Sequence, residues 1–262
     1  MKKKGLFIST VAATVAAVIV RIFITLYHTD AQTGKIDSPL WQLINTAILI
    51  VLVLISVSVY LKKYTDYKVE IIQNDIVFKS FSILAAVASL ICSVYCIMKY
   101  IASPYETFSI YAGVSATVSA AMFLYIGIAA KKIKKDLVLY LSIGPVAFFL
   151  LRIIEIFNFY SRNISLYTYK YEIVGLCCLI MLFVLFIAAA IGKTSAKSSL
   201  FFSLCGFSFL LAYSIPQILL PLFGKEYFTN NAPSYYAYSD LLFGICALYF
   251  GTIITPKKTV KH

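Results

Sequence analysis

The feature that most constrains this chain is a series of long apolar runs separated by short polar segments. A helix needs about 20 residues to cross the roughly 30 Å hydrocarbon core of a bilayer. Helices are expected there because backbone polar groups in lipid must bond within their own segment. We therefore predict an all-α bundle of eight transmembrane helices, near Gly5 to Tyr27, Trp41 to Leu61, Ile76 to Tyr100, Ser109 to Ala130, Leu137 to Tyr160, Tyr171 to Gly192, Leu200 to Phe223, and Asp240 to Thr255.

Composition agrees with a membrane protein. The chain is 61% hydrophobic and 13% charged, whereas soluble domains are about 45–50% apolar and about 25% charged. Too little polar sequence remains for a separate soluble domain, so the lipid bilayer is the first expected partner. We expect a multi-pass protein of a cell membrane, with short loops that suit a bacterial cytoplasmic membrane.

The net charge of +12 is a topology signal, because the basic residues occur as short clusters between apolar runs. We expect no nucleic-acid partner. With the N-terminus inside, the lysine-rich segments all face the same side, which predicts cytoplasmic N- and C-termini. These inner lysines are Lys2, Lys3, Lys4, Lys62, Lys63, Lys68, Lys131, Lys132, Lys134, Lys135, Lys193, Lys197, Lys257, Lys258 and Lys261.

The predicted outer segments are rich in tyrosine. An interfacial aromatic belt explains this pattern, because the ring lies at headgroup depth and the hydroxyl stays hydrated. The alternative is a tyrosine-lined mouth that stacks on a sugar or another flat solute. The tyrosines concerned are Tyr100, Tyr105, Tyr111, Tyr160, Tyr167, Tyr169, Tyr171, Tyr227, Tyr235, Tyr236 and Tyr238.

The two halves of the chain resemble each other. At a shift of half the chain length, Arg21 aligns with Arg152 and Lys62 with Lys193. Internal repeats of this kind indicate duplication, although apolar sequences also resemble one another by chance.

Residues 1–131 and 132–262 would each form a four-helix transmembrane repeat. Because four is an even number, both repeats would enter the membrane in the same sense and be parallel. Transporters built from parallel repeats bind substrate at the repeat interface. This analogy favours a site between the first and fifth predicted helices.

Arg21 and Arg152 are the most informative charges. Each lies about two turns inside the predicted outer end of its helix, where an arginine is costly. One interpretation is snorkelling, in which the side chain reaches the lipid phosphates. The other is that both guanidinium groups face the repeat interface and bind an anion, since their fork matches carboxylate and phosphate.

Other polar residues complete the predicted ligand site. Glu155 follows Arg152 by three residues, so the two share a helix face and can pair. Such a pair is either structural or a protonatable coupling element. Asn45 and Gln217 are possible helpers, so the predicted ligand-binding residues are Arg21, Asn45, Arg152, Glu155 and Gln217.

Prolines and small residues predict helix shape. Pro145 and Pro216 remove backbone donors and are expected to kink their helices. The small residues between Gly113 and Ala121 are typical of close helix packing.

Catalytic signals are weak. The two histidines are His28 and His262, and no Gly-rich phosphate loop, zinc signature or G-x-S-x-G motif occurs. Asp37 and Asp240 are expected outside the helix interiors. The six cysteines lie in apolar runs and act as small hydrophobes. We therefore expect no catalytic residues, no metal, no cofactor and no enzyme activity.

Two function classes remain open. The first is a transporter, or a solute- or lipid-binding protein, whose partner is an anionic small molecule or a lipid headgroup. The alternative is a non-transporting membrane subunit or sensor that docks a partner protein through its inner lysines or outer tyrosines. A membrane enzyme acting on lipids is a weaker third, because an acid/base pair is missing.

Overall fold

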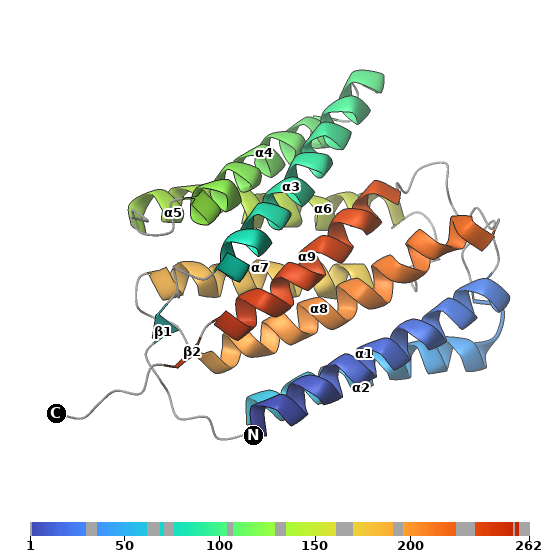
Figure 1. Cartoon of the computed structure of the whole chain (residues 1–262). Helices are drawn as coiled ribbons and strands as arrows, with labels where there is room; N and C mark the ends of the chain where they lie inside the picture. The colour runs from blue at the N-terminus through green and yellow to red at the C-terminus, as the bar shows by residue number, and fades with distance from the viewer. Residues whose placement is uncertain are drawn as a thin grey trace.

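The computed structural model describes residues 2–29, 36–61, 69–70, 76–103, 107–128, 135–160, 170–190, 196–223, 234–253 and 255–256. They form a bundle of helices (Figure 1). The elements are α1 (Lys2–Tyr27), α2 (Pro39–Leu61), β1 (Val69–Glu70), α3 (Ile76–Ala102), α4 (Thr107–Ile128), α5 (Lys135–Leu141), α6 (Ile143–Tyr160), α7 (Lys170–Ala190), α8 (Ala196–Leu219), the 3-10 helix η1 (Leu220–Phe223), α9 (Ser234–Ile253) and β2 (Thr255–Pro256).

The helices follow the predicted spans within a few residues, apart from the last. The fifth span is divided at Ser142, whose backbone N–H and hydroxyl both donate to the Val138 carbonyl, at 2.9 and 2.5 Å. Among the described residues seven helical stretches, α5 and α6 counted as one, are long and apolar enough to cross a membrane. A bundle of such helices is compatible with a multi-pass membrane protein.

The last helix, α9, is not among those seven stretches. It begins at Ser234, whereas the predicted span began at Asp240. The expectation that Asp240 lies outside the helix interior is therefore wrong. Its side chain is buried inside the second turn of α9, where Arg152 compensates its charge.

Helix α2 has a clear start signal. The Ser38 hydroxyl accepts a hydrogen bond from the Leu40 N–H at 3.3 Å, and Pro39 occupies the first helical position. Serine is a preferred N-cap, and proline suits a position whose N–H has no partner in the helix. The start thus lies less than two turns before Asn45, the first polar side chain that α2 contributes to the interior.

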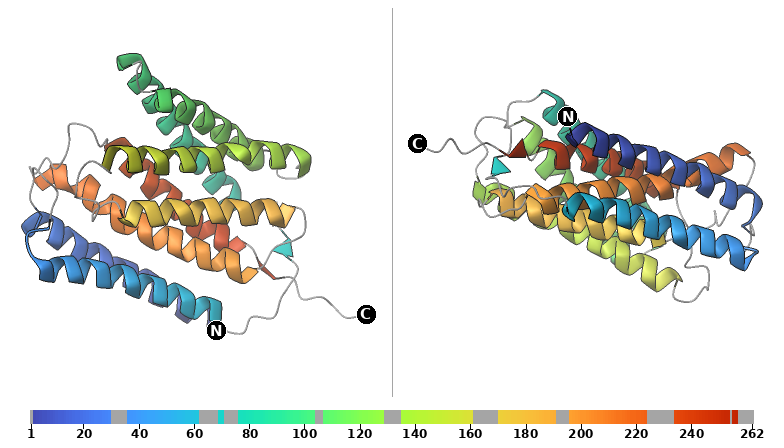
Figure 2. Two further views of the ribbon diagram at one scale, coloured as in Figure 1. Left: turned by 180° about the vertical axis from the view of Figure 1, so that it is seen from behind. Right: turned by 90° about the horizontal axis from the view of Figure 1, so that it is seen from below.

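The helices form layers in which α7 and α8 are central (Figure 2). Helices α1 and α2 pack against α8 on one side, whereas α6 packs on α7 and α4. The pair α3 and α4 completes the bundle, with α3 against α9. Helix α7 consequently lies between α6 and the α1–α2 pair (Figure 2), so the first and fifth predicted helices do not face each other.

Glycines allow some helices to approach closely. A Cβ at Gly144 would lie 2.9 Å from the Ser119 backbone nitrogen, and one at Gly113 would lie 3.0 Å from the Ile97 side chain. The Ser93 hydroxyl donates to the Gly113 carbonyl across the α3–α4 contact, at 3.0 Å. The small residues of α4 thus serve packing. Of the two prolines, Pro145 lies just after the Ser142 break, whereas Pro216 stays inside α8.

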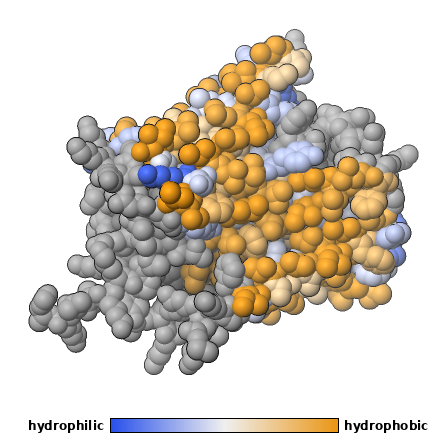
Figure 3. Space-filling model, in the orientation of Figure 1, coloured by the Kyte–Doolittle hydropathy of each residue, from blue (hydrophilic) through white to orange (hydrophobic). Residues whose placement is uncertain are grey.

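The surface of the bundle is apolar over a wide area (Figure 3). Large apolar side chains are exposed on most of the long helices, including Ile8, Leu54, Val94, Tyr111 and Phe157. Contiguous apolar surface of this extent is unusual for a soluble monomer. It is the surface expected of a protein in a lipid bilayer.

A short antiparallel pair joins β1 to β2, with Val69 opposite Pro256. It places the segments that follow α2 and α9 at one end of the bundle, where α1 begins (Figure 1). Most of the lysines that predict orientation lie outside the described residues. The cytoplasmic location of this end stays a prediction.

Candidate functional site

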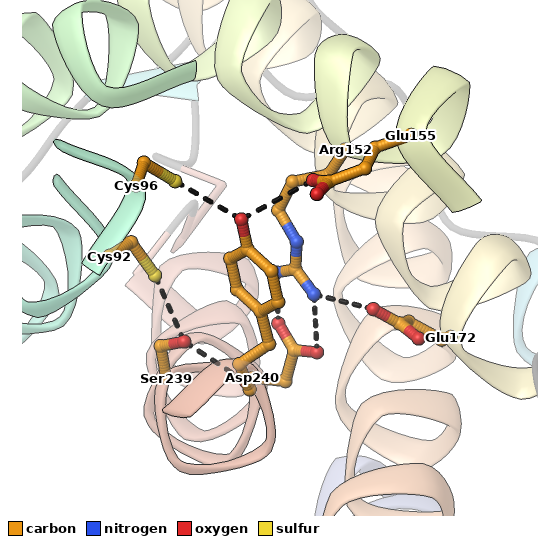
Figure 4. Close-up of polar contacts among 8 residues, drawn as sticks. Cys92, Cys96, Arg152, Glu155, Glu172, Ser239 and Asp240 are labelled. Carbon is orange, nitrogen blue, oxygen red and sulfur yellow. Dashed lines mark hydrogen bonds and ion pairs between the residues drawn. The ribbon is translucent and has the colours of Figure 1, made fainter. Parts of the chain in front are cut away.

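Arg152 lies at the centre of a buried charge cluster (Figure 4). Its Nη1 and Nη2 atoms donate to both carboxylate oxygens of Asp240, at 2.5 and 2.9 Å, and Nη2 also donates to Glu172 Oε1 at 2.5 Å. The three side chains come from α6, α9 and α7 and are at most 4% exposed. A bidentate pair of this kind is among the strongest contacts a protein makes.

Tyrosine and cysteine side chains extend this cluster toward α3. The Tyr236 ring lies over the Arg152 guanidinium, 4.2 Å from its Cζ atom. The Tyr236 hydroxyl is 3.1 Å from Cys96 Sγ and donates to Glu155 Oε2 at 3.4 Å. Tyr236 therefore connects the buried arginine with Glu155.

Glu155 pairs with Lys99 of α3, at 2.8 Å between Nζ and Oε1. About a quarter of each side chain is exposed. The expected pairing of Glu155 with Arg152 is therefore wrong. Glu155 pairs with Lys99 of α3, whereas Arg152 pairs with Asp240 of α9. The side chains of Glu155 and Lys99 form the more exposed end of the cluster.

Arg21 lies in a second cluster, formed by α1, α2 and α7. Its Nη1 donates to Asn45 Oδ1 at 3.0 Å, and its Cζ lies 4.1 Å from the centre of the Tyr171 ring. The Tyr171 hydroxyl donates to the Asn45 backbone carbonyl at 2.6 Å. Arg21 is only 3% exposed, yet its Nε donates to no atom of the described residues.

The two clusters meet on α7 at consecutive residues. Tyr171 contacts Arg21, and Glu172 contacts Arg152. Tyr213 of α8 hydrogen-bonds to Glu172 and also lies within the electrostatic range of Arg21. The two clusters therefore share neighbouring side chains on α7 and α8.

The five predicted ligand-binding residues are only partly brought together. Arg21 and Asn45 are in contact, whereas Arg152 lies in the other cluster with Glu155 at its edge. Gln217, in the last turn of α8, takes part in no polar contact of either cluster among the described residues. Neither arginine snorkels to lipid, because both are buried against protein side chains.

Sequence reasoning missed four residues of the site. Tyr171 and Tyr236 were expected in the interfacial belt, but both are buried under arginines. Glu172 and Asp240 supply the carboxylates that pair with Arg152. The sequence could have identified these two acids, because each lies in or beside an apolar run. A carboxylate within a membrane needs a partner.

The chemistry of the two clusters differs. Arg152 has two carboxylate partners, whereas Arg21 has none among the residues described. Within the same residues, no group of three or more His, Cys, Asp and Glu side chains is placed to hold a metal ion. The site therefore offers a buried cation and a separate cluster with excess negative charge.

Comparison of the chain with protein-family models, with curated proteins and with solved structures finds no match.

Proposed function

We propose that the protein binds an anionic solute or lipid headgroup at Arg21, as a multi-pass membrane transporter or binding protein. The observation that carries the proposal is that this buried arginine contacts no carboxylate among the described residues. Transfer of a charge out of water costs several kcal/mol unless an opposite charge compensates it. A bound anion would supply that compensation.

The surroundings of Arg21 suit a planar oxyanion. The Tyr171 ring covers one face of the guanidinium and Asn45 holds Nη1, which limits how the side chain can rotate. The Nε atom keeps an N–H without an acceptor in the described part of the chain. Guanidinium groups bind carboxylate and phosphate through such N–H donors.

The proposed anion site is formed around Arg21 alone and is not shared with Arg152. Arg152 is already neutralised by Asp240 and Glu172, so an anion there would have to displace a carboxylate. The parallel repeats, residues 1–131 and 132–262, remain a hypothesis about how the two arginines arose. Movement of the anion across the membrane is the transporter form of the proposal.

Trp41 offers a direct test, because it is the single tryptophan of the chain and lies one turn before Asn45 on α2. Its ring stacks on His28 at 4.3 Å and contacts Phe23 at 5.5 Å. We expect its fluorescence to change on titration of the purified protein with acetate or diethyl phosphate. The same titration with phosphatidylglycerol in neutral detergent tests a lipid source of the anion, with phosphatidylcholine as the uncharged comparison.

The variant Arg21→Gln should abolish the response. Lys79→Gln removes an equal charge from α3, outside both clusters, and should keep the response. A response to phosphatidylglycerol alone identifies a lipid headgroup, whereas a response to the soluble anions identifies a solute. Native protein that responds to none of these anions would refute an anion site at Arg21.

A further inference from the structure

We infer that the Arg152 cluster binds a proton when an anion binds at Arg21, so that the two events are coupled. This inference rests on the proposed function and adds the coupling ion to it. The proton comes from solvent and forms an O–H bond on one carboxylate of the cluster.

The Arg152 cluster contains more negative than positive groups. Two carboxylates, Glu172 and Asp240, share one guanidinium, and all three side chains are nearly inaccessible to solvent. Asp240 takes both Nη atoms of Arg152, whereas Glu172 takes one. Two carboxylates held by one cation repel each other, so one of them is readily protonated once the positive charge of Arg21 is neutralised.

In the absence of an anion, the positive charge of Arg21 offsets the excess negative charge of the Arg152 cluster. Among the described residues of these two clusters, the cations Arg21 and Arg152 match the carboxylates Glu172 and Asp240. A singly charged anion at Arg21 leaves one negative charge in excess inside the bundle. Because a buried uncompensated charge is costly, uptake of one proton restores neutrality.

The contacts between the clusters are short enough for this coupling. Tyr171 and Glu172 are adjacent on α7 and hold Arg21 and Arg152, respectively. Tyr213 faces both Arg21 and Glu172 from α8. Two charges that share such neighbours inside a medium of low dielectric constant interact more strongly than they do in water.

The other titratable groups around the two carboxylates do not alter the balance. Glu155 forms an ion pair with Lys99, in which the two charges offset each other. The other titratable groups that the described residues place near the carboxylates are hydroxyls and thiols, neutral when protonated, from α3, α7, α8 and α9: Cys92, Cys96, Tyr171, Tyr213 and Tyr236.

The test is the pH dependence of anion binding, measured by Trp41 fluorescence with diethyl phosphate, whose charge is constant near neutral pH. If binding takes up one proton, the affinity falls by up to about tenfold for each unit rise in pH between about pH 6 and pH 8. The sign follows from proton uptake, since a scarcer proton opposes a binding step that consumes it.

Two variants remove one carboxylate each. In Glu172→Gln or Asp240→Asn the clusters already carry one extra positive charge, so the anion should bind with an affinity that does not change with pH. Asp136→Asn is the matched control, because it removes an exposed carboxylate of α5 that lies outside both clusters, and its affinity should keep the native pH dependence.

The outcomes separate the two proposals. Native binding that does not vary with pH, or a pH dependence that survives in Glu172→Gln and in Asp240→Asn, overturns the coupling and leaves the anion site intact. Absence of binding at every pH overturns the proposed function itself.

Discussion

Arg21 and Arg152 are both buried but have different surroundings. Arg152 contacts two carboxylates, and its partners would be left as buried, unpaired charges without it. Arg21 contacts an amide and an aromatic ring. Burial of its charge therefore costs stability, which is the physical argument for the proposed anion site.

This contrast predicts opposite effects of removing the two charges. Arg152→Met leaves Glu172 and Asp240 unpaired and should lower the free energy of unfolding by about 3–5 kcal/mol. Arg21→Met loses one hydrogen bond and a ring contact but removes a buried charge that contacts no carboxylate among the described residues, so stability should stay equal or rise. Thermal unfolding in detergent measures both.

The matched pair of methionine variants controls for the change in side-chain shape. If Arg21→Met unfolds as readily as Arg152→Met, Arg21 is a structural residue and the anion is unnecessary.

The sequence identifies the residues whose charge is costly to bury, but it does not identify the residues that compensate those charges. Hydropathy marks Arg21 and Arg152 as exceptional because each stands in an apolar run. Their partners depend on which helices pack together, and Asp240 follows Arg152 by 88 residues. Spacing within one helix suggested Glu155 as the partner of Arg152, but Asp240 on α9 is the carboxylate that pairs with it.

Helix contacts depend on a few glycines where no side chain fits. A Cβ at Gly144 would meet backbone atoms of α4 at 2.9 and 3.0 Å, and these cannot move without moving the helix. At Gly206 of α8 the nearest atoms would be 3.7 Å away, which is ordinary contact. Identical substitutions at these two positions thus have different consequences.

We predict that Gly144→Ala lowers stability by about 1–3 kcal/mol, because α4 and α6 must separate. Gly206→Ala should be neutral or stabilising, since alanine favours the helix by about 0.5–1 kcal/mol. The measurement is thermal unfolding of both variants in one detergent. Equal losses in the two would show that the α4–α6 contact tolerates an added methyl group.

The elements themselves were largely predictable, because apolar length alone determines where a membrane helix can lie. Ends marked by local chemistry, such as Ser38 and Pro39 before α2, were also close to their predicted positions. The start of α9 was missed by six residues. Its first turns contain Asp240, whose burial depends on Arg152 and not on nearby sequence.

At the scale of the whole molecule, the path of the chain predicts the side on which it ends. Eight crossings return the C-terminus to the side of the N-terminus, whereas seven place it on the opposite side. The pairing of β1 with β2 favours the even number, since the segments that follow α2 and α9 lie together.

Reporter fusions measure this directly. Green fluorescent protein fused after His262 should fluoresce, and alkaline phosphatase at the same position should be inactive, because each reports a cytoplasmic location. Phosphatase inserted between Thr29 and Ile36 should be active, as the control for the outer side. An active phosphatase after His262 would mean that α9 does not cross.

The carboxylate of Asp240 also bears on how the chain is made. During synthesis the N-terminal helices reach the membrane first, so Arg152 enters before its bidentate partner exists. Helix α9 follows α6 and α7 in the chain and carries an acid that lipid alone disfavours. Its insertion therefore depends on helices already assembled, because Arg152 must be in place to pair with Asp240.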